Sequence, residues 1–137
     1  MILAAGRGKR LRPLTDSVPK SLATVGEHRL IEHHLLKLSR CGFGNVVINV
    51  SYLAEIIKEY LGDGTRYGIN IEYSTEPLLP LGTAGGIVNA LEKFHSDRLL
   101  VINSDVYSDI EFSSHDLAGD IDAHLVLVPN PQHHIEG

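Results

Sequence analysis

The chain has one cysteine, no long apolar run and no basic stripe along its length. Cys41 lacks a partner for an internal disulfide. No apolar stretch approaches the length of a membrane span or a signal peptide, since the first one ends at Gly6. A net charge of -5 without a basic stripe argues against nucleic acid or an anionic membrane as the main partner. We therefore expect a cytoplasmic protein with no nucleic-acid or membrane partner.

The length and the hydrophobic pattern predict one α/β domain. The 137 residues, 43% of them hydrophobic, are enough for a single globular core. Periodicity predicts helices at 29–40, 52–61 and 84–94, and strands before Gly6 and at 45–50, 69–73, 98–103 and 123–128. Strands that alternate with helices indicate βαβ units. The predicted fold is a Rossmann-like three-layer α/β/α sandwich with a mostly parallel sheet.

A glycine-rich, basic segment follows the first apolar residues. It reads L-A-A-G-R-G-K-R-L-R-P-L-T at 3–15 and closes with P-K at 19–20. Glycines let backbone N–H groups approach anionic oxygens, while arginine and lysine supply charge and donors that suit phosphate. Residues 7–20 contain five basic side chains, and Asp16 is the one acidic residue among them. The segment predicts a polyphosphate-binding loop; the alternative is a solvated connection that is merely basic.

Two better-known nucleotide-binding motifs are absent from this segment. The Walker pattern G-x-x-x-x-G-K-[ST] does not occur, and the dinucleotide pattern G-x-G-x-x-G would need glycine where Leu11 stands.

An acidic residue, Asp105, follows the predicted strand at 98–103, just as the basic segment follows the first strand. Ligands of parallel sheets bind beyond the carboxyl ends of the strands, so both features point to one crevice. A turn or a helix cap is the alternative role for Asp105.

The whole pattern L-A-A-G-x-G-x-R-L-x-P-L-T-x-x-x-P-K resembles the signature of the sugar-phosphate nucleotidyltransferases. The resemblance implies the nucleotide-diphospho-sugar transferase fold and the coupling of a sugar 1-phosphate to a nucleoside triphosphate, with release of pyrophosphate. It implies that Arg10 and Lys20 are catalytic and that Asp105 binds Mg²⁺, a cation that prefers carboxylate and phosphate oxygens. The implied nucleotide-binding residues are Ala4, Ala5, Gly6, Gly8, Glu76, Gly82, Thr83 and Asn103.

Several of these positions belong to a second motif. The run L-G-T-A-G-G at 81–86 resembles the family's base-binding loop, and Glu76 stands where many relatives place an acid upstream of it. The spacing between Glu76 and that run is longer than the commonest form. The run could instead be a helix entry capped by Thr83.

Softer matches concern the substrate and the extent of the domain. N-P-Q-H-H at 130–134, L-G-D-G at 61–64 and S-D-V-Y at 104–107 resemble uridylyltransferases that act on N-acetylmuramic acid 1-phosphate in cell-wall recycling, which favours UTP. Mannose-1-phosphate guanylyltransferases and glucose-1-phosphate nucleotidyltransferases are alternatives, as is a non-catalytic nucleotide-binding module. We expect 1–137 to be the N-terminal, nucleotide-binding portion of the domain, without the C-terminal sugar-binding part and its second metal ligand. The sequence indicates no oligomeric state.

Overall fold

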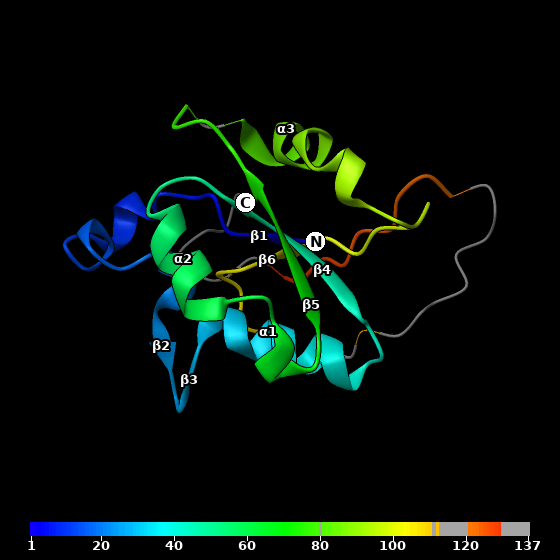
Figure 1. Cartoon of the computed structure of the whole chain (residues 1–137), viewed down its shortest axis with the longest axis horizontal. Coiled ribbons are helices and arrows are strands. Elements are labelled where there is room, and N and C mark those ends of the chain that lie inside the picture. The colour runs from blue at the N-terminus through cyan, green and yellow to red at the C-terminus, as the bar shows by residue number, and fades with distance from the viewer. Residues whose placement is uncertain (80, 111, 113–120, 130–137) are drawn as a thin grey trace.

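The computed structural model describes residues 1–79, 81–110, 112 and 121–129, and it shows a parallel sheet between two layers of helices (Figure 1). The sheet contains β1 (Ile2–Leu3), β4 (Asn45–Val50), β5 (Asn70–Thr75) and β6 (Ile102–Asn103) in the order β5-β4-β1-β6, and all neighbours are parallel. Helices α1 (Leu30–Arg40) and α2 (Ala54–Leu61) cover one face, and α3 (Gly82–Asn89) covers the other. The predicted α/β class is confirmed.

Alternation along β4 builds a core on both faces of the sheet. Val46, Ile48 and Val50 belong to the large core, which also contains the buried faces of α1 and α2. Val47 belongs to a smaller core with Met1 and Ala90 on the side of α3. Successive side chains of a strand point to opposite faces, so one apolar strand supplies both layers.

Local contacts and glycine residues set the ends of α1 and α2. In α1 the Glu32 carboxylate accepts a hydrogen bond from the Arg29 N–H at 2.7 Å, which satisfies a free donor at the helix start. Gly42, with φ of +83°, follows its last turn. Helix α2 ends similarly at Gly62, with φ of +61°. A small hairpin, β2 (Thr24–Val25) with β3 (His28–Arg29), precedes α1.

Three predicted elements differ from the structure. The strand predicted at 98–103 is limited to Ile102–Asn103, because it pairs with β1, which has only two residues. The helix predicted at 84–94 is α3, Gly82–Asn89, followed by a 3-10 helix at Leu91–Lys93; the Asn89 amide turns back to the Ser74 hydroxyl at 3.0 Å.

The strand predicted at 123–128 is wrong. No strand exists within the described residues 121–129, and the side chains of Leu125 to Val128 are 65 to 83% exposed. A strand requires a hydrogen-bonded partner strand, so apolar, β-branched residues do not make one by themselves.

Among the described helices, none is long and apolar enough to cross a membrane.

Candidate active site

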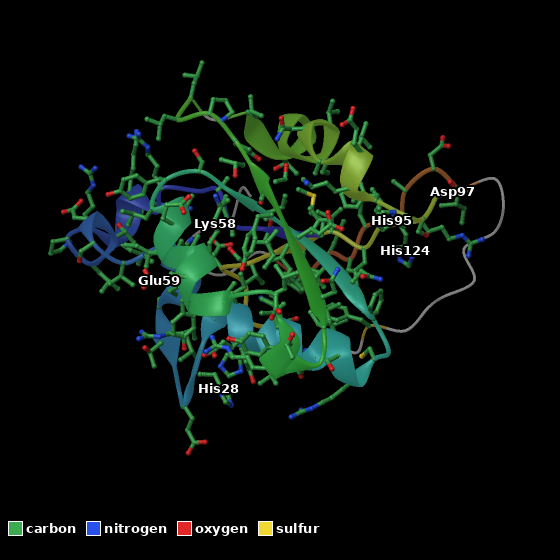
Figure 2. All side chains as sticks on the ribbon, viewed as in Figure 1. His28, Lys58, Glu59, His95, Asp97 and His124 are labelled. Carbon is green, nitrogen blue, oxygen red and sulfur yellow. The ribbon has the colours of Figure 1, made fainter. Side chains whose placement is uncertain are left out.

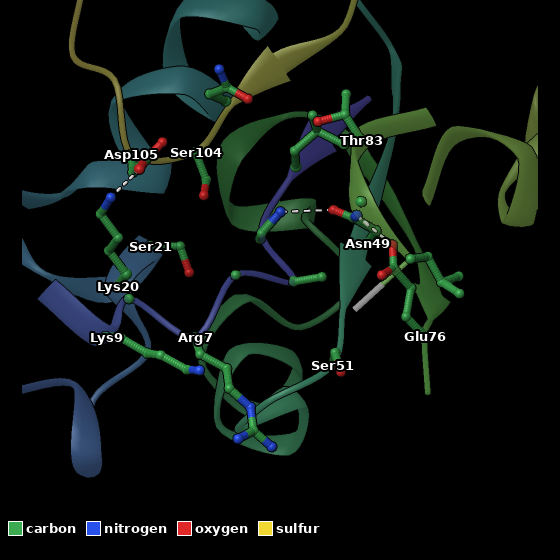
Figure 3. A pocket seen from close by; sticks show the side chains of 18 of the residues that line it. Arg7, Lys9, Lys20, Ser21, Asn49, Ser51, Glu76, Thr83, Ser104 and Asp105 are labelled. Atoms are coloured by element: carbon green, nitrogen blue, oxygen red, sulfur yellow. Dashed lines mark hydrogen bonds and ion pairs between the residues drawn. The ribbon is translucent and has the colours of Figure 1, made fainter. Parts of the chain in front are cut away.

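A cavity of about 630 Å³ opens at the carboxyl ends of the four parallel strands (Figure 3). The strand order places β1 in the middle: the connection from β5 through α3 to β6 crosses to the other side of β1. This is the topological switch point at which open α/β sheets bind ligands. The structure places every predicted site residue in the cavity lining except Arg10, which lies in the exposed 3-10 helix Lys9–Leu11.

The loop after β1 is folded back on itself by Gly8 and Thr15. Gly8 has φ of +61°, and its carbonyl accepts hydrogen bonds from the Leu11 N–H and the buried Thr15 hydroxyl, both at 2.9 Å. A Cβ on Gly8 would stand 2.9 Å from Thr15 Cγ2 and 3.1 Å from Lys20 Cβ. Only glycine fits this position, both for its backbone conformation and for the close approach of the chain. At Gly6, by contrast, a Cβ would meet no atom within 4 Å, so this backbone faces open space.

Lys20 and Asp105 come from the loops that follow two neighbouring strands, β1 and β6. The Lys20 ammonium forms an ion pair with the Asp105 carboxylate (Figure 3). Lys20 is placed by the return of the chain beside Gly8. Asp105 is placed by β6, because the Ser104 N–H donates to the Leu3 carbonyl at 3.1 Å. A cation and a carboxylate therefore stand together next to the glycine loop.

At the other side of the loop, Asn49 and Glu76 form a buried polar pair. The Ala4 N–H donates to Asn49 Oδ1 at 2.7 Å, and Asn49 Nδ2 donates to Glu76 Oε1 at 2.6 Å (Figure 3). Glu76 is positioned by its own N–H, which donates to the Val50 carbonyl at 2.8 Å. Both side chains are buried and both line the cavity.

The start of α3 and the segment before it close the same side of the cavity. Gly82, with φ of +71°, begins α3, and Gly82 and Thr83 line the cavity. The N-terminal end of a helix carries partial positive charge, which favours an anionic ligand. Leu78 and Leu79 also line the cavity and are 68% and 79% exposed, so an apolar surface faces the ligand space.

The residues present fit a magnesium ion that is shared with phosphate groups. Mg²⁺ is usually held by one or two carboxylates together with substrate phosphates. Asp105 supplies one carboxylate beside the glycine loop, and Asn103 lines the cavity next to it. Within the described residues, no three side chains of His, Cys, Asp or Glu gather as a ready-made metal site. Histidines such as His28, on the β2–β3 hairpin, and His95, after α3, come from separate parts of the fold (Figure 2).

Behind Asp105, the α1 residue His34 is buried against the segment that follows β6. Burial lowers the pKa of His34, and the charges of Lys37 and His33 lower it further; a backbone hydrogen bond with Val106 and the charge of Asp105 oppose this. Its Nε2 has no hydrogen-bond partner among the described residues. The neutral imidazole therefore acts as part of the packing beneath the site.

The cavity also contains residues that the motifs did not identify. Arg7 and Lys9 add positive charge, and Ser21, Asn49, Ser51 and Ser104 add polar groups. Asn49 had a signal in the sequence: it is an amide within a strand predicted to be buried, and a buried amide needs hydrogen-bond partners. Ser21 carried no such signal; its hydroxyl is buried and has no partner among the described residues.

The chain is similar in sequence to known sugar-phosphate nucleotidyltransferases. The chain is 49% identical over its whole length to N-acetylmuramate alpha-1-phosphate uridylyltransferase of Neisseria meningitidis, and it spans 62% of that relative. It is 38% identical to mannose-1-phosphate guanylyltransferase of Mycobacterium tuberculosis, with 96% of this chain and 38% of the relative covered.

A solved structure has the same fold. A proposed glucose-1-phosphate thymidylyltransferase from Bacillus anthracis, crystallised with sucrose, superposes with a TM-score of 0.73 at 30% identity, covering 79% of this chain and 44% of that one. Residues 1–127 match the family described as nucleotidyl transferase. The chain thus belongs to the nucleotidyl transferase family, the sugar-phosphate nucleotidyltransferases.

Proposed function

We propose that the protein couples a sugar 1-phosphate to a nucleoside triphosphate in a Mg²⁺-dependent reaction that releases pyrophosphate. The observation that carries the proposal is the pairing of Lys20 with Asp105 beside the glycine loop. The pairing supports the proposal because an ammonium group suits phosphate, a carboxylate suits Mg²⁺, and the cavity beside them is large enough for a nucleotide. The Neisseria relative supports UTP and N-acetylmuramic acid 1-phosphate as substrates, giving the UDP-sugar. The proposal places this reaction in the cytoplasm, in the recycling of cell-wall sugar.

The roles of the loop follow from the chemistry of the reaction. An oxygen of the sugar phosphate attacks the α-phosphorus, a new P–O bond forms, and the bond to the leaving pyrophosphate breaks. The attacking oxygen is already ionised, so no general base is needed and catalysis is positioning and charge stabilisation. Gly6 and Gly8 offer backbone donors to the phosphates, Lys20 stabilises charge on the α-phosphate, and Arg10 steadies the leaving pyrophosphate. Mg²⁺ bound at Asp105 would supply further charge neutralisation on the phosphate oxygens.

The nucleoside is assigned to the opposite side of the loop. Glu76, Gly82 and Thr83 face it, with Ala4, Ala5 and Asn103 along the sheet edge, and Leu78 and Leu79 provide an apolar surface for the base. We also propose that residues 1–137 are the nucleotide-binding portion of the domain. The chain spans about three fifths of the Neisseria relative, which makes substrate turnover a property to be tested separately from nucleotide binding.

The test combines binding with turnover. Calorimetry on the chain with UTP or GTP and Mg²⁺ should show binding, and pyrophosphate release should be assayed with UTP, GTP and dTTP against several sugar 1-phosphates. If the chain binds nucleotide without turnover, the assay is repeated on a chimaera that adds the part of the Neisseria relative beyond the aligned region. Turnover in neither form would refute the enzyme and favour the non-catalytic module.

Asp105→Asn is the informative variant for the metal. It should reduce Mg²⁺-dependent turnover by about 10²-fold or more, because a carboxylate ligand is replaced by a weaker, neutral one. Asp109→Asn is the matched control, since it removes the same charge at an exposed position outside the cavity. Equal activity of the two variants would contradict the assignment of Asp105.

The second candidate within the enzyme class is a guanylyltransferase. A carboxylate such as that of Glu76 accepts hydrogen bonds, and guanine offers two adjacent N–H groups where uracil offers one. The Mycobacterium relative is named for this reaction with mannose 1-phosphate. Competition between UTP and GTP in the same calorimetric experiment decides between the two.

A further inference from the structure

Asn49 occupies a position where three elements meet. It lies in β4, directly opposite Leu3 of β1 in the parallel register, and its side chain is 4% exposed. The peptide N–H of Ala4 can only donate, so Asn49 Oδ1 must face it, at 2.7 Å. The amide nitrogen is thereby turned toward Glu76 Oε1, at 2.6 Å. The backbone at the start of the glycine loop thus fixes which end of the amide Glu76 meets.

We propose that Asn49 is a positioning residue that holds the Glu76 carboxylate ready to accept a hydrogen bond from the edge of the nucleotide base. This rests on the proposed function, in which Glu76 faces the base. Asn49 donates to one carboxylate oxygen and leaves the other to the ligand. No described residue forms an ion pair with Glu76, so its orientation depends on this neutral donor.

The side of the carboxylate that faces α3 is fixed as well. A Cβ on Gly86 would stand 2.5 Å from Glu76 Oε1 and 2.9 Å from Asn49 Nδ2, so the helix backbone packs directly on the pair. The carboxylate is held between a hydrogen-bond donor on β4 and the backbone of α3. A group held from two sides presents its free oxygen in one direction, which is what discrimination between bases requires.

The expected selectivity follows from the hydrogen-bonding edges of the bases. An ionised carboxylate only accepts. Uracil and guanine each present a ring N–H at this edge, whereas cytosine and adenine present a ring nitrogen with a lone pair there. A fixed Glu76 should therefore favour UTP and GTP over CTP and ATP. Loss of its positioning should reduce this preference and leave phosphate binding unchanged.

The first experiment separates base recognition from phosphate binding. Affinities for UTP, CTP and inorganic tripolyphosphate are measured by calorimetry with Mg²⁺ for the wild type and for Asn49→Ala. We expect UTP binding to weaken about tenfold, the size of effect for one lost hydrogen bond to a charged group. The UTP-to-CTP ratio should fall with it, and tripolyphosphate affinity should stay the same.

A second variant gives a readout that a purely structural role would not produce. In Asn49→Asp, two carboxyl groups meet at the distance of the present hydrogen bond and must share a proton, which raises the pKa of the pair. Below that raised pKa the protonated pair keeps the contact; above it both groups are ionised and repel. UTP affinity should therefore be restored at pH 5 and reduced at pH 8.

Charged groups elsewhere in the cavity lie on other segments: Arg7, Lys9 and Lys20 on the loop after β1, and Asp105 after β6. The matched control is Asn45→Asp, which adds the same charge at the exposed opposite end of β4. Its UTP affinity should change with pH only as the wild type does.

The outcomes distinguish this inference from the proposed function. If the wild type binds no nucleotide, the proposed function fails. If it binds UTP, and both Asn49 variants keep the wild-type UTP-to-CTP ratio at both pH values, the role of Asn49 is overturned while the proposed function stands. Equal losses of UTP and tripolyphosphate would overturn it too, because they would show that Asn49 supports the loop rather than the base site.

Discussion

Replacing Gly86 by alanine tests whether α3 is packed directly on the Asn49–Glu76 pair. Gly86 is buried within α3, and its φ is not positive, so an alanine is compatible with its backbone. In an exposed helix this substitution stabilises by about 1 kcal/mol, since glycine is a poor helix former. Here the added Cβ would lie 2.5 Å from Glu76 Oε1, closer than real Cβ contacts. The structure therefore predicts the opposite sign.

The magnitude follows from two costs and one gain. Overpacking a well-filled site costs about 1–3 kcal/mol, and losing the hydrogen bond from Asn49 to the Glu76 carboxylate costs about 1.5–3 kcal/mol. Subtracting the helix gain of about 1 kcal/mol leaves a free energy of unfolding lower by about 3 kcal/mol. For a chain of this size the Tm should fall by about 10 °C.

Thermal melting and urea unfolding measure the effect, and two variants control it. Gly44→Ala places a Cβ where no atom lies within 4 Å and should change stability by less than about 0.5 kcal/mol. Glu76→Ala removes the oxygen that the new methyl group would meet. In the double variant Gly86→Ala with Glu76→Ala, the alanine at 86 should therefore cost little, which gives a large coupling energy. A single Gly86→Ala variant that melts at or above the wild-type temperature would refute the direct packing of α3 on the Asn49–Glu76 pair.

Two further predictions concern the charge of the loop and the packing behind Asp105. Arg10→Ala should lower turnover by about 10²-fold at unchanged Tm, because the side chain is exposed and its proposed role is on the leaving pyrophosphate; wild-type rates, or a loss no greater than in Arg12→Ala, would contradict that role. Burial lowers the pKa of His34 in the folded protein. As the pH falls, the unfolded chain therefore takes up a proton on His34 near pH 6.5, before the folded protein does. The contribution of His34 to the free energy of unfolding is complete above that pH and declines as the pH falls toward the lower pKa of the folded protein. Urea unfolding at pH 7.5 and 5.5 should show a smaller decline for His34→Leu than for the wild type, and equal declines would show that the imidazole is not the cause.

The elements that sequence could predict are those whose pattern is satisfied locally. Helix α1 and strand β4 lie within one residue of their predicted bounds, because an apolar stripe and a buried apolar run each specify one structure. The run at 123–128 has an equally apolar pattern and forms no strand, because a strand depends on a partner elsewhere in the chain. Family motifs identified ten of the twenty residues that line the cavity. The motifs also named Arg10, but Arg10 lies outside the cavity lining, because its position depends on how the loop folds around Gly8.

Asn49 shows why part of the site was not predictable from motifs. Its amide oxygen accepts a hydrogen bond from the Ala4 N–H, directly after β1, and its amide nitrogen donates to the Glu76 carboxylate, directly after β5. Neither partner is near Asn49 in sequence. The composition of β4 indicated only that a buried amide would need partners. Which partners it has depends on the strand order, since β4 lies between β1 and β5.

The same strand order separates the two tasks of the proposed reaction. β1 lies between β4 and β6, so the glycine loop after β1 has Asn49 and Glu76 on one side and Ser104 and Asp105 on the other. In the reaction we propose, base recognition depends on β4, β5 and α3, whereas phosphate chemistry depends on β1 and β6. Substitutions on the first side can change the nucleotide without touching the reacting groups.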